Sequence, residues 1–219
     1  ARSRYLASNN PYAAMAKDAY VSALVGGGIK PSSETEDSDI RQAINQAWRT
    51  WTDEADADHV TDFYGLQTII ASEMFEAGEC FVRFRPRQLS DGYSVPLQLQ
   101  LLPSEMLDVT HNTITSNGSI RNGIQFDKRG MRLGYWFYVN MPNELIQYNM
   151  AGNYKVFVPA SEVLHLYKPI RAGQIRGVPH TLAGMVTLAM LDLYDDAELE
   201  RKRVAALFAA FIKRTGAND

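Results

Sequence analysis

Apolar residues in the N-terminal part of the chain recur at the spacing of α-helices. The first helix is predicted over PYAAMAKDAYVSALV. Asn9 or Asn10 can cap it, Pro11 suits its first turn, and Gly26 to Gly28 end it. A polar, acidic linker, PSSETEDS, follows.

Two further helices are predicted after this linker. Ser38 or Asp39 caps the first of them, whose apolar face ends in Trp48 and Trp51 and must dock on something. The full face consists of Ile40, Ala43, Ile44, Ala47, Trp48 and Trp51. The next helix begins near Asp62 and stops at Gly78.

From residue 79 onward the period of the apolar residues changes from that of a helix to that of a strand. ECFVRFRPR and VPLQLQLLP alternate apolar with polar residues, which is typical of half-buried strands. Further short strands are predicted in SNGSIRNGIQFD, MRLGYWFYV, YKVFVPA and VLHLYKP, separated by Gly, Asn and Pro turns. No helical crossovers interrupt them, so the sheet should be mostly antiparallel.

The last element is a long helix, since no strong breaker except Gly184 occurs between Thr181 and about Arg214. Pro179 fixes the approach to a Thr181 cap. The fold class is therefore α+β, with helices packed on a mostly antiparallel sheet of short strands and one long C-terminal helix. We predict an α+β body over residues 1–170, a junction loop over 171–180 and the helix over 181–214.

Composition narrows the function classes. With 22 basic and 25 acidic residues the net charge is -3, so the summed charge does not attract nucleic acid or anionic lipid. The single cysteine, Cys80, excludes an intrachain disulfide, and no apolar run is long enough to span a bilayer. We expect no membrane partner. The chain starts at Ala1 and stops at Asp219 after a helical pattern, and we expect it to be a piece of a longer protein.

The segment KPIRAGQIRGVPH, Lys168 to His180, is the strongest candidate for a functional loop. It lacks the spacing of a phosphate-binding loop, because three residues separate Gly173 from Gly177 and Val178 follows where a lysine should stand. We therefore interpret it as the junction between the strands and the long helix, where its glycines permit unusual backbone angles.

No catalytic, cofactor or metal site is predicted. The acidic run from Asp53 to His59 lacks the glycine and glutamate of a calcium loop, and no paired His or Cys spacing or nucleophile elbow occurs. Cys80 is predicted to be a small core residue and His165 a structural histidine. Trp48 and Trp51 are predicted to pack in a core or an interface, although aromatic rings can also stack on bases.

Six residues remain as candidate contacts to a neighbouring subunit or a DNA backbone. They are Lys168, Arg171, Gln174, Arg176, Arg201 and Arg203. Arginine's forked donors suit phosphates and carboxylates alike. The alternative is that the arginines are solvated, with the run at 201–203 paired to Asp195, Asp196, Glu198 and Glu200 of the same helix.

Several segments run colinearly from about Arg4 to Ile212 in an order that is specific as a whole. They are RYLASNNPYAAMAKDAYVSALVGGGIKP, WRTWTDEADADHVTDFYGLQTIIASEMFEAGECFVRFR, LQLLPSEMLD, NGIQFDKRG, VPASEVLHLYKPIRAGQIRGVP and LYDDAELERKRVAALFAAFI. Together they resemble the lambda-type portal proteins of tailed bacteriophages.

The resemblance implies a structural subunit of a virion, assembled in the bacterial cytoplasm. It implies a dodecameric ring at one capsid vertex that forms the channel for DNA packaging and ejection. The implied partners are the large subunit of terminase, the scaffold and major capsid proteins, the head-completion proteins and double-stranded DNA. The 1–170 body would correspond to the wing region, and the long helix would lead toward the stem and clip.

Two other functions are weighed against the portal. A DNA-processing enzyme or enzyme-associated module would use KPIRAGQIRGVPH as its active loop, but it would need a P-loop or acidic metal ligands that the sequence lacks. A nucleic-acid-binding or other component of the phage head, with a similar α+β body, is the third possibility. Ring formation separates the portal from the enzyme, and ring size together with the rest of the protein separates it from another head component.

Overall fold

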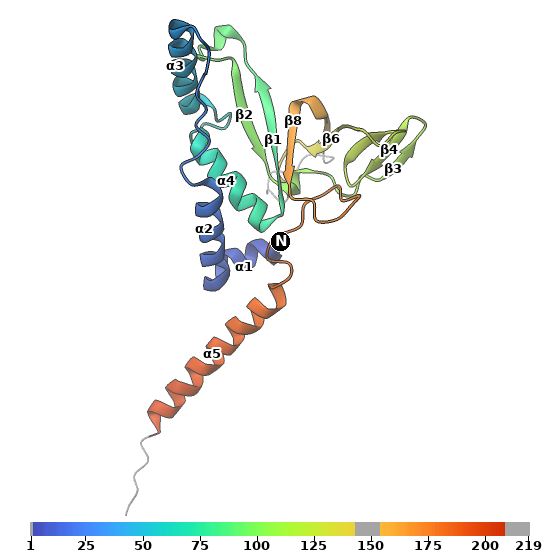
Figure 1. Cartoon of the computed structure of the whole chain (residues 1–219). Helices are drawn as coiled ribbons and strands as arrows, with labels where there is room; N and C mark the ends of the chain where they lie inside the picture. The colour runs from blue at the N-terminus through green and yellow to red at the C-terminus, as the bar shows by residue number, and fades with distance from the viewer. Residues whose placement is uncertain (1, 143–153, 209–219) are drawn as a thin grey trace, which may run out of the picture.

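The computed structural model describes residues 2–142 and 154–208, and it confirms the α+β class (Figure 1). Four helices precede the strands: α1 (Arg2–Asn9), α2 (Pro11–Val25), α3 (Ser38–Glu54) and α4 (Phe63–Glu76). The strands are β1 (Glu79–Pro86), β2 (Leu97–Leu102), β3 (Thr113–Thr115), β4 (Gly118–Arg121), β5 (Ile124–Asp127), β6 (Arg132–Tyr138), β7 (Lys155–Pro159) and β8 (Val163–Tyr167). Helix α5 (Met185–Leu207) follows.

Of the two predicted caps of α2, Asn10 is confirmed, and Asp62, which was predicted near the start of α4, caps that helix. Asn10 Oδ1 accepts a hydrogen bond from the amide of Ala13 at 3.0 Å, and Asp62 Oδ1 accepts one from the amide of Gly65 at 2.7 Å. Each satisfies an amide that has no partner within the helix. Gly26 caps the C-terminal end of α2, also as predicted.

The predicted cap of α3 is wrong by one residue. Asp37, not Ser38 or Asp39, has the extended backbone of an N-cap and accepts hydrogen bonds from the amides of Asp39 and Ile40 at 2.9 and 3.1 Å. All three residues can cap a helix, so only the backbone angles distinguish them. The short helix α1 was not predicted, and its anchoring contacts come from distant parts of the chain.

The strands form two antiparallel sheets instead of the one that was predicted. The first sheet has the order β2-β1-β8, and the second has the order β3-β4-β5-β6-β7. The chain crosses between them at the 3-10 turn Ala160–Glu162, which separates β7 in the second sheet from β8 in the first. Alternation marks each strand locally, but it does not say which strands pair.

The first sheet packs against different partners on its two faces. On one face Phe81 packs edge-on to Tyr135 and Phe137 of β6, with ring centroids 5.5 and 5.2 Å apart. On the other face Leu99 and Leu101 pack against the cluster that contains Trp51 and Leu66. Remaining members of the core between the sheets are Leu102, Leu107, Ile124, Phe126, Val158 and Val163.

The tryptophans of α3 are packed, as predicted. The indole nitrogen of Trp51 donates a hydrogen bond to the carbonyl oxygen of Leu97 at 2.7 Å, and Trp48 packs on the Trp51 ring at 5.0 Å between centroids. The other end of the same apolar face is open, since Ile40 and Ile44 are about half exposed at 50% and 47%. Only the C-terminal half of α3 therefore docks on the first sheet.

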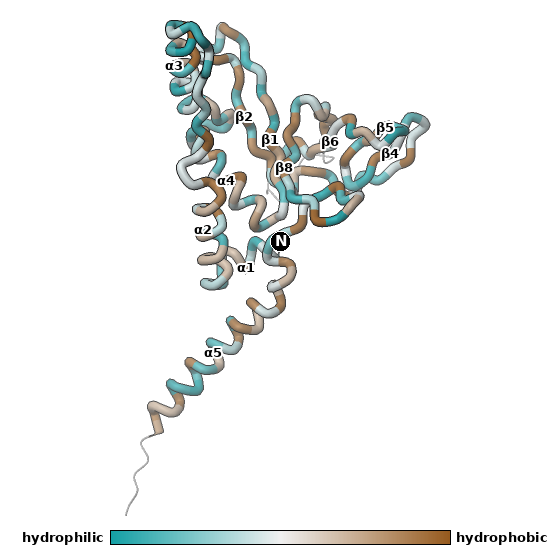
Figure 2. Tube along the Cα trace, viewed as in Figure 1, coloured by the Kyte–Doolittle hydropathy of each residue, from teal (hydrophilic) through white to brown (hydrophobic). Residues whose placement is uncertain are grey.

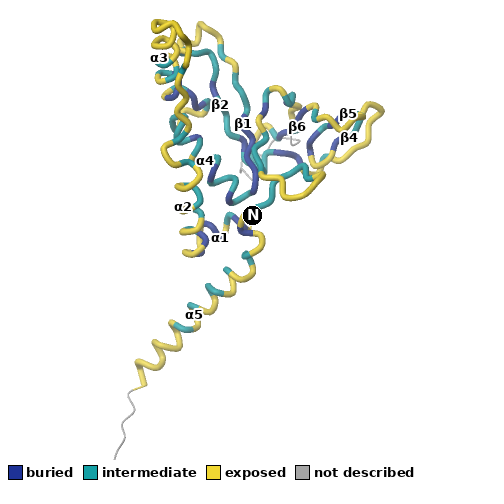
Figure 3. Tube along the Cα trace, viewed as in Figure 1, coloured by how far each residue is buried: buried dark blue, intermediate teal, exposed yellow. Residues whose placement is uncertain are grey.

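Helix α5 points away from the body (Figure 1). It begins at Met185, and the predicted Thr181 cap is wrong: residues 181–184 form turns, and Thr181 Oγ1 lies 2.6 Å from Ser3 Oγ. The predicted extension to residue 214 lies mostly outside the described residues. Apolar and polar residues alternate along α5 without a buried side, as Figures 2 and 3 show.

Replacing the cap of α4 tests its contribution to stability. Asp62→Ala should lower the free energy of unfolding by about 1 kcal/mol, because the amide of Gly65 loses its acceptor inside a packed region. Asp62→Asn is the matched control and should retain most of the stability, since asparagine caps equally well. Urea denaturation compares the three proteins; equal losses for Ala and Asn would contradict the assignment.

Candidate functional site

The junction loop is held by one buried carboxylate. Glu79, at the start of β1, is 2% exposed. Its carboxylate accepts hydrogen bonds from Arg176 Nε at 2.7 Å and from the amide of Gly177 at 2.7 Å, and Arg176 Nη2 contacts the same oxygen as Nε. The third partner is His165 Nε2 of the neighbouring strand, at 2.9 Å. The loop is thus fastened to both β1 and β8.

Burial and hydrogen bonds together determine the protonation states of Glu79 and His165. Burial opposes ionisation of Glu79, but the hydrogen bonds from His165 and Arg176 outweigh it, and the pKa of Glu79 lies below its ordinary value. Burial also lowers the pKa of His165 below 6.5, despite the opposing effect of Glu79. At neutral pH, Glu79 is therefore a carboxylate and His165 is a neutral imidazole that donates through Nε2. The prediction of a structural histidine is confirmed.

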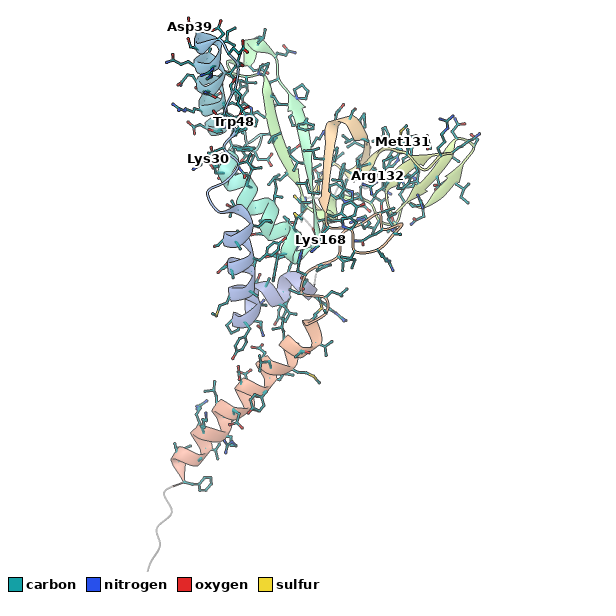
Figure 4. The ribbon with its side chains drawn as sticks, viewed as in Figure 1. Lys30, Asp39, Trp48, Met131, Arg132 and Lys168 are labelled. Carbon is teal, nitrogen blue, oxygen red and sulfur yellow. The ribbon has the colours of Figure 1, made fainter. Side chains whose placement is uncertain are left out.

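Arg132 extends the network from the second sheet. Its guanidinium lies 3.3 Å from His165 Nδ1 and donates to the hydroxyl of Tyr167 at 2.5 Å. The Tyr167 hydroxyl in turn donates to the carbonyl oxygen of Gln174 at 3.1 Å. In Figure 4, Arg132 lies on the second sheet, while Lys168 marks the start of the loop at the foot of the first. One polar network therefore connects both sheets to the loop.

Gln174 closes the loop on itself. Its side-chain oxygen accepts from the amide of Ile170 at 2.9 Å, and its nitrogen donates to the carbonyl oxygen of Arg176 at 2.6 Å. These two bonds replace backbone pairing in a segment without regular structure. Both polar atoms of the Gln174 side chain are thus hydrogen-bonded to backbone groups of the loop, and Gln174 helps to hold the loop in shape.

Two glycines let the loop cross β1 at backbone contact. A Cβ added to Gly177 would lie 2.1 Å from the carbonyl oxygen of Gly78, and one added to Gly78 would lie 2.1 Å from the backbone of Val178. Gly78 also has a left-handed backbone, with φ of 84°. The sequence predicted unusual backbone angles for the glycines of this loop. At Gly177, glycine is needed because the loop backbone passes too close to the backbone of Gly78 to leave room for a Cβ.

Beyond the loop, the base of α5 rests on the first two helices. Asn10 Nδ2 donates to the carbonyl oxygen of Leu188 at 3.1 Å, and the Tyr12 hydroxyl donates to Asp195 at 2.9 Å. His180 precedes this contact, with its ring stacked on Phe75 at 6.0 Å between centroids. The start of α5 is therefore fixed to the body, whereas its later turns are not.

A second ionic cluster holds α1. Arg4 donates to Glu73 at 2.6 and 2.7 Å, to Glu105 at 2.8 and 2.9 Å and to Glu76 at 3.0 Å. Hydrogen bonding to Glu73 and then to Glu105 raises the pKa of Arg4. Neither Arg4 nor Glu79 was among the predicted site residues, because their partners are far away in the sequence. Glu79 could have been noticed from the sequence only as a charged residue at the start of an otherwise apolar strand.

The six predicted contact residues have different surroundings. Arg176 and Gln174 are bonded within the loop region, as described above. Arg201 pairs with Glu198 at 2.9 Å and Arg203 with Glu200 at 3.3 Å on the exposed side of α5. Lys168 and Arg171 are exposed and form no ion pair within residues 2–142 and 154–208. The structure does not bring the six residues together into one site.

Candidate reactive groups are scarce in the described part of the chain. No group of three or more His, Cys, Asp or Glu side chains there could hold a metal ion. Cys80 is fully buried, and burial raises the pKa of its thiol to about 12, so it is a core residue as predicted. None of the described helices is long and apolar enough to cross a membrane.

Comparison with known protein families decides the identity of the chain. The model for "Phage portal protein, lambda family" matches residues 1–219. The chain belongs to this family. Portal proteins are structural components of the virion and not enzymes, so the alternative prediction of a DNA-processing enzyme is wrong.

Individual relatives carry the same description. The chain is 29% identical over 182 residues to the "Probable portal protein" of Halomonas phage phiHAP-1, covering 81% of this chain and 34% of that relative. It is 24% identical over 235 residues to "Portal protein B" of Escherichia phage lambda, covering 97% of this chain and 42% of that relative. The chain thus spans less than half of either portal protein.

Two solved structures share the fold. One is titled "Virion of native gene transfer agent (GTA) particle", with a TM-score of 0.54, 13% identity and coverage of 97% of this chain and 47% of that chain. The other is titled "Neck of empty GTA particle computed with C6 symmetry", with a TM-score of 0.56, 14% identity and coverage of 99% and 49%. At these identities the likeness concerns the fold alone.

Substitution of Gly177 tests the close approach of the loop to β1. Gly177→Ala should lower the free energy of unfolding by about 1–3 kcal/mol, because its Cβ would meet backbone that cannot rotate away. Gly27→Ala is the control, since its Cβ would meet only the end of the Lys30 side chain at 3.7 Å. Urea denaturation gives the stabilities, and limited proteolysis should cut the Gly177→Ala loop faster. Equal stability of both variants would contradict the contact.

Buried His165 should make the protein sensitive to acid. Its folded pKa lies below 6.5, so the unfolded chain takes up a proton that the folded chain does not, and stability falls as pH drops below about 6.5. His165→Gln should flatten the stability profile between about pH 7 and pH 5, whatever its effect on stability at pH 7. Urea denaturation across this range measures both slopes; parallel slopes would refute the assignment.

Proposed function

We propose that the protein containing this chain is a subunit of a portal ring, in full a dodecamer, at one vertex of a phage or gene transfer agent particle. The ring forms the channel for DNA packaging and ejection and docks the terminase motor. Other partners are the scaffold and major capsid proteins, the head-completion proteins and the double-stranded DNA in the channel. The match of the portal family model to residues 1–219 is the observation that carries this proposal.

The surroundings of α5 support a role in a larger assembly. Leu193, Tyr194 and Leu199 are 60–70% exposed, and Leu207 is 83% exposed. A monomer in water rarely exposes so many large apolar side chains on one element, because contiguous apolar surface favours association. Further chain or neighbouring subunits covering α5 would remove this surface from water. In this proposal, the α+β body is the wing, the junction loop connects it to α5, and α5 leads toward the stem.

The net charge of this chain and the symmetry of a related particle also agree with a DNA channel. A net charge of -3 favours weak contact with DNA, and DNA must slide through a portal. The gene transfer agent neck that shares the fold carries sixfold symmetry in its title, and a dodecamer is compatible with a sixfold axis.

Electron microscopy of the complete protein tests the proposal. It should show closed rings with rotational symmetry and a central channel, and particles that remain monomeric at high concentration would refute it. In this proposal, Lys168 and Arg171 are the candidate contacts to a neighbouring subunit or to DNA. Arg176 instead bonds to Glu79 of its own chain and holds the loop in place.

Removing these two exposed charges tests their role. Lys168→Ala with Arg171→Ala should reduce ring yield or packaged DNA at least several-fold, whereas Lys128→Ala with Arg129→Ala, an equal charge change at an exposed turn, should not. Ring yield is measured by size-exclusion chromatography and packaged DNA by phage titre. Equal loss in both double variants would mean that Lys168 and Arg171 have no specific contact.

A further inference from the structure

One face of the first sheet carries a row of arginines. Strand alternation puts Arg83 and Arg85 on the same side of β1 as Phe81. Arg87 follows at the same interval, and its Nε donates to Gln98 of the paired strand β2 at 2.7 Å. We name Arg83, Arg85 and Arg87 the arginine row.

The arginine row has more positive charge than the described residues around it neutralise. Arg83 lies 3.5 Å from Glu162, and Asp58 is the other carboxylate on this face that acts on Arg85. Within the described segments, Arg85 and Arg87 form no ion pair. Burial and then the charges of Arg83 and Arg87 lower the pKa of Arg85, so these cations repel one another. An anionic partner would relieve that repulsion.

A cleft beside the arginine row suits acidic side chains. Its volume is about 240 Å³, and it is bounded by Arg83 and Arg85 on the first sheet and by Phe137 and Tyr138 on the second. Arg83 Nε is buried and has no hydrogen-bond partner in the described structure. A space of this size admits individual carboxylate side chains but not a DNA duplex. The geometry therefore favours an acidic protein segment.

The chain itself carries such a segment. Glu34, Glu36 and Asp39 are exposed in the linker before α3 and its first turn, and they form no ion pair with described residues. We name these three residues the acidic strip. Figure 4 labels Asp39 at the free end of α3. Asp37 is not included because it caps α3.

The linker before α3 is tied to that helix by hydrogen bonds. Arg41 Nε donates to the carbonyl oxygen of Thr35 at 2.8 Å, and Asn45 Oδ1 accepts from the amide of Ser33 at 3.1 Å. Both partners come from α3, so the linker lies along that helix. Ordering before contact reduces the entropy that association would otherwise cost.

The arginine row and the acidic strip lie on opposite sides of the first sheet. Helices α3 and α4 cover the face of Leu99 and Leu101, whereas the arginine row shares the face of Phe81 (Figure 1). The two patches therefore cannot meet within one chain.

We propose that the acidic strip of one subunit docks on the arginine row of the next subunit around the ring. This inference rests on the proposed function, because it requires neighbouring copies of the chain. Two different, complementary patches on opposite sides of a subunit make a head-to-tail contact, and such contacts close into a ring when the rotation closes. The contact is electrostatic, so it weakens as salt rises.

Charge reversal of each patch, alone and together, tests the contact in the complete protein. The variants are the pair Arg85→Glu with Arg87→Glu, the pair Glu34→Lys with Glu36→Lys, and their combination, which again places unlike net charges opposite one another. The pairs Lys128→Glu with Arg129→Glu and Asp18→Lys with Asp53→Lys are controls with the same charge changes at exposed positions outside both patches. The concentration for half-maximal ring assembly is measured by light scattering and electron microscopy at low and moderate salt.

Each single-patch reversal should raise that concentration at least about tenfold at low salt, and the combination should recover most of the loss. The controls should assemble like the parent. Rings unaffected by both reversals, or no recovery in the combination, would overturn this contact while leaving the portal assignment intact. Rings that form normally in the Arg85→Glu, Arg87→Glu variant but retain less DNA would assign the arginine row to DNA instead. Failure of the unmodified protein to form rings would overturn the proposed function and this contact with it.

Discussion

The buried carboxylate of Glu79 is the constraint on which the junction depends. A charge out of water is tolerated only when its hydrogen-bonding capacity is met, and here the partners come from β8 and from the junction loop. Loss of Arg176 or Gly177 contacts would leave an uncompensated charge in the core. The loop therefore has one favourable course across the sheet, and that course sets where α5 begins.

This course has consequences for how α5 is held. The helix receives support at its base, from α1, α2 and the loop, and its later turns leave the body without lateral contacts among the described residues (Figure 3). The sheet and the loop therefore set the direction in which α5 projects. The exposed apolar side chains of α5 favour association with other protein surfaces. Such a division between a self-contained body and a projecting helix suits a subunit of an assembly.

The body itself is two-sided in charge. Helices α3 and α4 separate the acidic linker from the arginine-bearing face of the first sheet, and Glu34, Glu36 and Asp39 form no ion pair with the described residues. A subunit with unlike charges on opposite sides is suited to head-to-tail association, whereas a single self-complementary patch would favour two-fold pairing. The overall charge of -3 hides this arrangement, because opposite patches cancel in the sum.

Local chemistry in the sequence determined the elements: Asn10 and Asp62 begin helices because they bond to amides three residues away, and alternation marked β1 and β2. Only the tertiary structure decided how these elements combine. Glu79 and Arg176 are 97 positions apart, and the sheet switch between β7 and β8 depends on pairing with strands far back in the chain. Cap geometry at Asp37 and the late start of α5 also escaped prediction, because contacts and backbone angles select among equally suitable residues. Periodicity carries short-range information, and long-range pairing does not leave a periodic trace.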